Sequence, residues 1–167
     1  MRLPEVIVGQ TFNILLNRVA LKRKPDVVIG SLLRPYLKRW HLIPRNPAFN
    51  IYLHQFLRSD DDRALHDHPW VNLSILLHGT YTEHTIAAGG IHERTVRRTG
   101  DLKLRGALDA HRIELTDGPC WTLFLTGPRW RIWGFHCAEA GWVPWKQFTR
   151  ELPGGVSEVG AGCGEAP

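Results

Sequence analysis

Cysteine is scarce in this chain: its 167 residues include only Cys120, Cys137 and Cys163, and no CxxC pair. An odd count without paired spacing argues against a disulfide scaffold, and a four-cysteine zinc module would need one more cysteine. A reducing cytoplasm is therefore the expected compartment. Cys120 and Cys137 lie in or beside predicted strands, where we expect them to be small buried hydrophobic residues.

Long apolar runs are missing as well. The longest stretch without Asp, Glu, Lys or Arg covers 15 residues, 68–82, which is shorter than the ~18 apolar residues of a typical membrane span. Pro4 and Glu5 interrupt any secretory pattern at the N-terminus. The sequence also has no GxSxG element and no Gly-rich phosphate loop. We therefore expect no membrane partner and no hydrolase or nucleotide site of those types.

Acidic residues are few in the first quarter of the chain. Residues 1–45 carry a net charge of +7 and residues 46–167 carry −2, which together give the formal charge of +5. The basic stretch could contact nucleic acid or a membrane surface. Alternatively, it could be a solvated face beside an acidic neighbour, for which the aspartates at 60–62 are a candidate. The stretch is short and has no nucleic-acid-binding motif, so we favour the solvated face.

Residues 1–47 differ in pattern from the rest of the chain. Apolar residues between positions 5 and 23 recur at helical spacing. A second short helix is expected from Ser31 to about Trp40, before two prolines break the chain. We interpret residues 1–47 as an N-terminal helical or irregular extension.

Short candidate strands separated by Gly, Pro and Asp turns dominate residues 48–152. They cover residues 49–58, 72–77, 80–87, 91–98, 111–116, 121–126 and 131–137. Many short strands with such turns indicate an all-β sandwich or barrel. Residues 153–167 are rich in glycine and have little to bury, so we predict a disordered tail there.

Three histidines form the most informative pattern. His66 and His68 are two residues apart, so in a strand both imidazoles point to the same side. His111 opens a later candidate strand. Two histidines from one strand and one from another would form a three-nitrogen metal site with open positions for water or substrate. The alternative is an incidental pair of surface histidines, and spacing alone does not separate the two.

The same segment resembles the two sequence motifs of the cupin superfamily, written G-x5-H-x-H-x3,4-E-x6-G and G-x5-P-x-G-x2-H-x3-N. The chain reads His66-x-His68-x3-Asn72-x6-Gly79 and, later, Gly100 followed by His111 at the motif spacing. The departures from the two motifs are Asp60 for the first glycine, Asn72 for the glutamate, and Gly106, Leu108 and Leu115 in the second motif.

The resemblance covers about residues 49–137 and implies an all-β cupin double-stranded β-helix (jelly-roll) barrel at 48–152. It implies His66, His68 and His111 as metal ligands. Without the glutamate, the site is similar to that of the three-histidine non-haem iron dioxygenases of the family. Fe(II) is thus the favoured divalent metal, with Zn, Mn or Ni as alternatives. Asn72 could contact the metal, a bound water or the substrate, and the resemblance also implies a homodimer.

Three functions stay open at this point. The favoured one is a mononuclear non-haem Fe(II) dioxygenase-like enzyme that acts on a small molecule. The others are a non-enzymatic barrel that binds a metal or small ligand, and an isomerase or epimerase with His66 or His111 as base. No catalytic residue is assigned. Candidate pocket residues are Arg58, Trp70 and Tyr81, although a solvated Arg58 and structural roles for the two aromatic residues are simpler interpretations.

Overall fold

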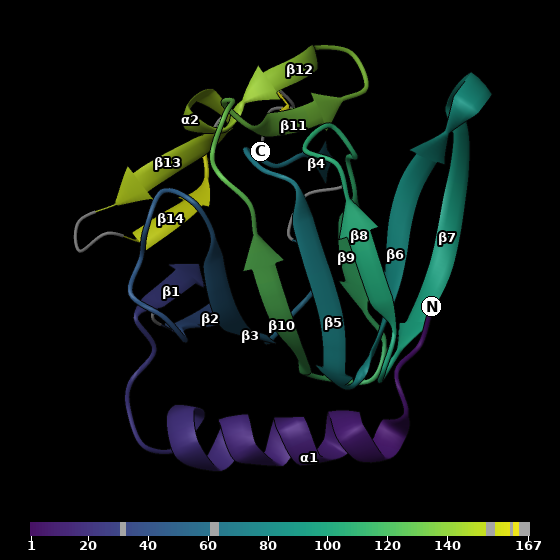
Figure 1. Cartoon of the computed structure of the whole chain (residues 1–167). Coiled ribbons are helices and arrows are strands. Elements are labelled where there is room, and N and C mark those ends of the chain that lie inside the picture. Colours follow the sequence, from purple (N-terminus) through teal and green to yellow (C-terminus); the bar gives the residue numbers. More distant parts are fainter. Residues whose placement is uncertain (31–32, 61–63, 153–155, 161, 164–167) are drawn as a thin grey trace.

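The computed structural model describes residues 1–30, 33–60, 64–152, 156–160 and 162–163. Most of these residues form antiparallel strands, with one long helix, α1 (Glu5–Leu15), which continues into a π-helical turn, Leu16–Ala20. Figure 1 shows α1 lying across one end of the strands. No helix in the described ranges is both long and apolar enough to cross a membrane.

One wall of the barrel is a six-stranded sheet. Its order is β1 (Val27–Gly30), β2 (Pro35–His41), β3 (Asn50–Phe56), β10 (Cys120–Thr126), β5 (Asn72–His78) and β8 (Leu102–Arg105). Along β5, Asn72, Ser74 and Leu76 are buried on the inner face, while Leu73 and Ile75 face the other way and are half-buried. In β3 and β10, three consecutive residues are buried, as expected where both faces of a strand are covered.

The opposite wall contains a three-stranded sheet and its neighbours. Its order is β7 (Ile91–Arg98), β6 (Thr80–Ala87) and β9 (Arg112–Leu115), with the 3₁₀ turn Ala88–Gly90 between β6 and β7. A bridge between His66 and His111 joins β4 (Leu65–His66) to the start of β9. The order β3-β10-β5-β8 facing β4-β9-β6-β7 is that of a jelly roll. The predicted all-β jelly-roll barrel with an N-terminal helix is confirmed.

The C-terminal part covers one end of the barrel (Figure 1). It consists of β11 (Gly134–Cys137), β12 (Gly141–Pro144), α2 (Trp145–Phe148), β13 (Thr149–Leu152) and β14 (Val156–Val159). The first of these pairs with β4, and the last two form a hairpin. Of the predicted disordered tail at 153–167, residues 153–155, 161 and 164–167 lie outside the described residues, and Val156–Val159 forms β14.

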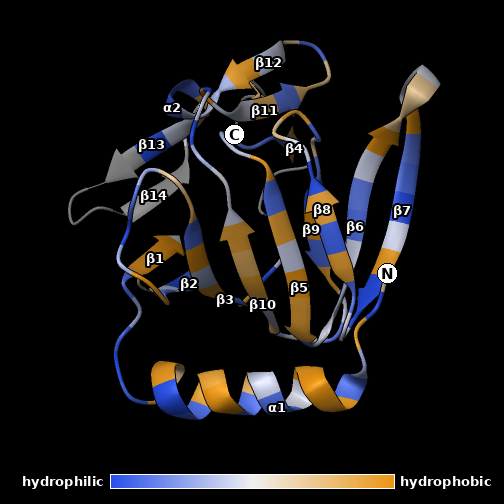
Figure 2. Ribbon diagram, viewed as in Figure 1, coloured by the Kyte–Doolittle hydropathy of each residue, from blue (hydrophilic) through white to orange (hydrophobic). Residues whose placement is uncertain are grey.

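The outer face of the six-stranded sheet carries a hydrophobic cluster that receives α1. Val8 is buried there, and Phe12 packs beside it against sheet residues such as Trp40, Leu53 and Trp121. Figure 2 shows the apolar residues that run along α1 and along these strands. The helix therefore holds its place through an apolar stripe.

The second helix predicted from Ser31 to Trp40 is wrong. Pro35–His41 is strand β2, which pairs with β1 on one side and β3 on the other. Leu37 belongs to the inner core and Trp40 to the outer cluster, so the segment alternates as a strand does. Ser31 itself lies outside the described residues.

The expectation about cysteine pairing is also corrected. Cys137 of β11 forms a disulfide with Cys163, at a Cα–Cα distance of 5.4 Å, so Cys137 is not a free hydrophobic residue. Cys120 is confirmed as a buried free cysteine. The bond ties the C-terminal segment to β11, and it removes the argument for a reducing compartment that rested on the cysteine count.

Candidate metal site inside the barrel

Backbone pairing brings the three motif histidines together. The amide of His66 donates to the carbonyl of His111 at 2.9 Å, and the reverse hydrogen bond is 3.0 Å long. The amide of His68 is fixed by the carbonyl of Ala107 at 3.0 Å. Asp67, between the two histidines, points the other way and accepts hydrogen bonds from the amide of Gly134 and the indole of Trp142.

The geometry of the three rings suits a metal ion. One ring nitrogen from each histidine lies within 4.8 Å of the other two. The Nε2 atoms of His68 and His111 are 3.0 Å apart. Two nitrogens that each lie about 2.0–2.1 Å from one ion, at a right angle, are roughly 3 Å apart. The rings are thus spaced as neighbouring ligands of one metal would be.

Burial keeps all three imidazoles neutral. Desolvation lowers the pKa of His66 and lowers that of His68 well below its ordinary value. It lowers the pKa of His111 to about 3, helped by the charge of Arg105 and opposed by Glu83. A neutral imidazole has the free lone pair that metal binding requires. The donor set therefore fits a divalent metal.

Glu83 of β6 supports His111 from behind. It is fully buried, and its Oε1 lies 3.4 Å from Nδ1 of His111. It also accepts hydrogen bonds from Nε of Arg105 and Nε of Arg97, both at 2.8 Å. Burial raises its pKa, but His111 and Arg105 outweigh this and the net pKa is lowered, so it stays ionised. A carboxylate at Nδ1 directs Nε2 of His111 toward the other two rings.

The neutral histidines predict a pH dependence for the metal-free protein. Their pKa values in the fold lie below the unfolded value of ~6.5, so the unfolded chain binds more protons in the interval between them. The free energy of unfolding should therefore fall as the pH is lowered from about 7 to about 5, a range that largely avoids carboxylates. Urea unfolding at several pH values measures this. The variant His111→Gln should show a smaller slope than the wild type; an equal slope in the two proteins would contradict the assignment.

The residues at two departures from the cupin motifs, Asp60 and Asn72, differ in their contacts. Asp60, at the place of the first glycine, accepts hydrogen bonds from the Tyr36 hydroxyl and from the amide of Ile113. Asn72, at the place of the glutamate, is 1% exposed, and neither of its side-chain amide atoms has a hydrogen-bond partner among the described residues. Asp61 and Asp62, suggested as neighbours of the basic stretch, lie outside the described residues.

The three candidate pocket residues lie in different surroundings. The guanidinium of Arg58 lies over the ring of Tyr36, 5.8 Å from its centroid, and close to Gly30. Tyr81 belongs to the apolar inner core with Leu37, Phe56, Leu76, Ile113 and Cys120. Trp70 is half-buried, and its indole nitrogen has no partner in the described part of the chain. Of the three, only Trp70 follows the histidine segment directly.

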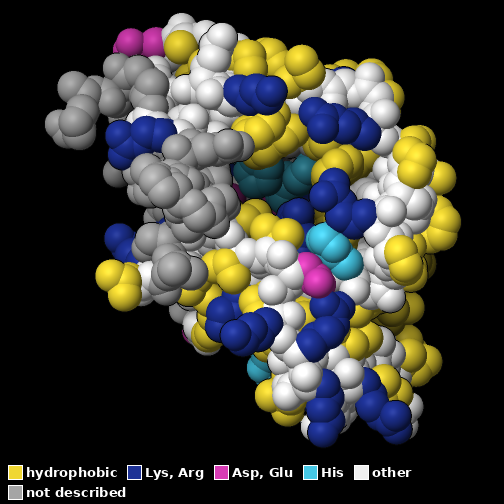
Figure 3. Space-filling view, turned by 90° about the vertical axis from the view of Figure 1, so that its left-hand side faces the viewer, with side chains coloured by type: hydrophobic (Ala, Val, Ile, Leu, Met, Phe, Trp, Pro, Cys, Tyr) yellow, Lys and Arg dark blue, Asp and Glu magenta, His cyan; other side chains and the backbone are white. Residues whose placement is uncertain are grey.

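The molecular surface has a hollow on the side shown in Figure 3. Histidine side chains lie deep inside this hollow, and Lys or Arg side chains lie along part of its rim among hydrophobic ones (Figure 3). The opening gives small molecules a path toward the barrel interior, where a site of this fold would lie.

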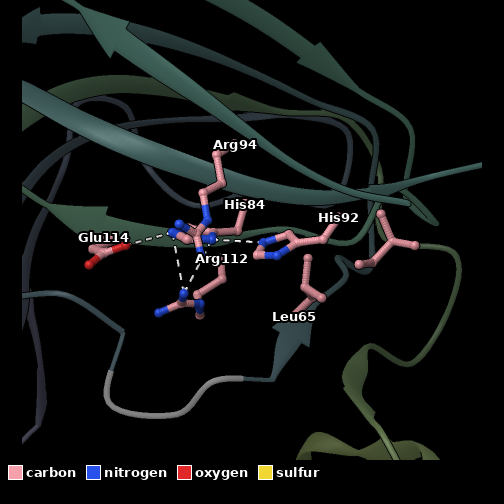
Figure 4. Close-up of a pocket in the computed structure, with 7 residues that line it drawn as sticks. Leu65, His84, His92, Arg94, Arg112 and Glu114 are labelled. Atoms are coloured by element: carbon pink, nitrogen blue, oxygen red, sulfur yellow. Dashed lines mark hydrogen bonds and ion pairs between the residues drawn. The ribbon is translucent and has the colours of Figure 1, made fainter. Parts of the chain in front are cut away.

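A second histidine cluster lies on the outer face of β6, opposite to Glu83. It borders a depression of ≈ 610 Å³ (Figure 4). Nδ1 of His84 is 2.9 Å from Nε2 of His92, and Nε2 of His84 is 2.7 Å from Oε2 of Glu114. Arg112 also approaches His84 at 3.2 Å. Both nitrogens of His84 are engaged by neighbours, so this depression has less to offer a metal than the group of His66, His68 and His111.

Comparison with known proteins gives matches at the level of structure. No protein-family model matches the chain, and no curated protein matches it by sequence. Similar solved structures include a cupin superfamily protein from Desulfitobacterium hafniense, with 12% identity and a TM-score of 0.45 over 64% of this chain and 83% of that one. Hydroxypropylphosphonic acid epoxidase from S. wedmorenis has 14% identity and a TM-score of 0.48, over 62% and 57% of the two chains.

Oxalate decarboxylase from Bacillus subtilis is a third similar structure, with 17% identity and a TM-score of 0.49 over 69% of this chain. The match spans only 30% of the decarboxylase. Independently of these matches, the strand order is that of a jelly roll, with His66 at the end of β4, His68 shortly after it and His111 directly before β9. The chain therefore has a jelly-roll fold.

Proposed function

We propose that this chain binds one divalent metal ion through His66, His68 and His111 and acts on a small molecule, as a non-haem Fe(II) dioxygenase-like enzyme. The observation that carries the proposal is the meeting of three neutral imidazoles inside the barrel, with Nε2 of His68 and Nε2 of His111 3.0 Å apart. Fe(II) bound there would supply redox chemistry with dioxygen. Three protein ligands leave coordination positions for other groups.

The residues of this chain have separable tasks in this proposal. The three histidines hold the metal, and Glu83 holds His111 in the ring orientation that ligation needs. Asn72 is a candidate hydrogen-bonding partner for a bound water or substrate, because its buried amide is not used by described neighbours. Neutral nitrogen ligands also suit zinc, manganese or nickel, so Fe(II) is the favoured metal and not the sole candidate.

A homodimer belongs to the proposal as well, whereas the cytoplasmic location predicted from the sequence does not. The homodimer follows from the family resemblance. The location followed from the cysteine count, and the Cys137–Cys163 bond now weighs against it, since disulfides persist in oxidising compartments.

Elemental analysis of protein purified without chelators tests the metal. Near-stoichiometric iron, or another divalent metal after reconstitution, is expected for the wild type and for the control variant His78→Ala. His66→Ala and His111→Ala should both lose it, because each removes one of three ligands. His78 is an exposed histidine of β5, so it controls for loss of a surface imidazole.

Two results would count against the proposal. A wild-type protein that cannot be loaded with any divalent metal would overturn metal binding altogether. A loaded protein that consumes no oxygen with a panel of thiols, diketones and aromatic acids would overturn the dioxygenase part and leave a metal-binding barrel.

A further inference from the structure

The interior of the barrel is divided into an apolar end and a polar end. The apolar end holds the inner core around Leu37 and Phe56. Two positions further along the same strands, the inward residues become Arg39 of β2 and His54 of β3. Arg39 is opposite His54 in the register, and His54 is opposite Thr122 of β10. These three side chains therefore form one row across the inner face of the sheet.

This polar layer contains buried groups that their neighbours do not satisfy. Among the described residues, no partner is found for Nδ1 of His54, for the hydroxyls of Thr122 and Thr126, or for the amide of Asn72. All four side chains are more than nine-tenths buried. An unsatisfied buried polar group costs about 1–3 kcal/mol, so such groups are rare unless a water, an ion or a ligand partners them. Their gathering on one inner face marks this face as a binding surface.

Arg39 supplies a charge to this surface. Its Nε donates to Nε2 of His54 at 2.8 Å, and its guanidinium lies over the ring of Tyr52, 4.9 Å from the centroid. In the described part of the chain, no carboxylate forms an ion pair with it. The other arginines of the interior are matched: Arg105 pairs with Glu83 and Arg131 with Asp67. Arg39 is thus an always-charged group, held in place by aromatic neighbours, with its remaining donors available.

The hydrogen bond between Arg39 and His54 fixes the position of Arg39 and also the tautomer of His54. Because Nε2 of His54 accepts the hydrogen bond from Arg39, the neutral ring carries its proton on Nδ1. Nδ1 is the atom without a partner, so it offers a hydrogen-bond donor on the same inner face. Arg39 and His54 together therefore present donors and a positive charge.

The polar layer adjoins the metal site through one aromatic ring. Phe124 of β10 stacks on His54 with ring centroids 5.1 Å apart, and its ring centroid is 6.0 Å from that of His68. From this geometry we infer that the ligand of the barrel is a small organic acid, whose carboxylate binds Arg39 while its other end reaches the three histidines. The inference rests on the proposed function only for the contact of the ligand with the three histidines. It replaces Arg58 with Arg39 as the carboxylate partner.

The test compares acids with their neutral amides. Full-length protein, both metal-loaded and metal-free, is titrated with glycolate against glycolamide and with benzoate against benzamide, in a calorimeter. At least one acid should bind more tightly than its amide in both forms of the protein. Arg39→Gln should weaken binding of that acid by at least about tenfold and abolish the preference over the amide. The exposed-site variant Arg18→Gln, on the π-helical turn after α1, should behave as the wild type.

Arg39→Lys guards against a folding defect, because it keeps the charge and loses the planar fork. It should bind the acid between the wild type and Arg39→Gln. Equal binding of acids and amides by the wild type, or a preference that survives in Arg39→Gln, would overturn the inference. If the protein binds no metal but still prefers an acid over its amide, the Arg39 site is supported and the proposed function fails. If the protein binds metal but shows no preference for acids, the proposed metal site stands and the Arg39 inference fails.

Discussion

Glu83→Ala is expected to lower the free energy of unfolding by on the order of 3–5 kcal/mol. The reason is that Glu83 is the acid that neutralises Arg105, whose side chain is 2% exposed. Removing it leaves a cation buried in the barrel wall, and breaking a buried pair by deleting one partner is far more costly than deleting both. The total free energy of unfolding of many domains is only about 5–15 kcal/mol, so the expected loss is a large fraction of it.

Urea unfolding of three variants measures the effect. Glu83→Gln keeps the size and one acceptor oxygen, so its loss should be smaller than that of Glu83→Ala. Glu93→Ala, at an exposed position of β7, should leave stability nearly unchanged. If the alanine variant at Glu83 unfolds at the same urea concentration as the Glu93 control, the buried network does not stabilise the fold as we describe.

The two Glu83 variants should also lower the affinity for the metal, and Glu93→Ala should not. Because Glu83 lies behind Nδ1 of His111, its loss frees the ring to rotate. Loss of such supporting groups typically lowers metal affinity 10–100-fold. The folded Glu83→Gln protein is the one in which to measure this by competition with a chelator.

Deleting residues 1–45 is expected to abolish soluble folding. The deletion removes β1 and β2, and β2 is hydrogen-bonded to β3 over five residue pairs from Leu37 to His41. It also removes Trp40 and the helix that covers Leu53, and so exposes the outer face of the sheet to water. The basic stretch is thus expected to be structural.

Expression and size-exclusion chromatography of the truncated chain check this. A shorter deletion of residues 1–3 is the control: it removes the bridge of Arg2 to Asp101 but keeps α1 and every named strand, and should remain soluble. A truncated chain that elutes as a folded, metal-binding monomer or dimer would show that residues 46–167 form the barrel alone.

The jelly roll was predictable because the local sequence pattern of most of its strands is typical of a β-strand. In β5 and β10, alternating or continuous apolar runs end at glycine or proline, and such patterns need no distant partner to be recognised. The histidine motifs were predictable for the same reason: their spacing is local within His66–His68, and His111 falls at the expected distance along the chain. The structure brings these three together.

Other features depend on contacts between distant residues and could not be derived from spacing. The sequence from Ser31 to Trp40 favours a helix locally, and the pairing of Pro35–His41 with β1 and β3 makes it strand β2. Glu83 and Arg39 belong to neither cupin motif. Their importance appears only when the strands align them with His111 and His54. The Cys137–Cys163 bond likewise joins positions 26 residues apart that no motif connects.

Strand β7 has one more consequence, which concerns self-association. It pairs with β6 on one side, and among the described strands none pairs with its other side, so its free backbone groups could accept a strand from another molecule. Exposed Ile91 and Val96 would favour such growth into larger aggregates. Arg94 and Arg98 stand on the same strand, and like charges on two approaching copies repel each other. The two arginines therefore oppose sheet extension at this edge. Variants that lack them should aggregate at high protein concentration even if the fold is unaffected.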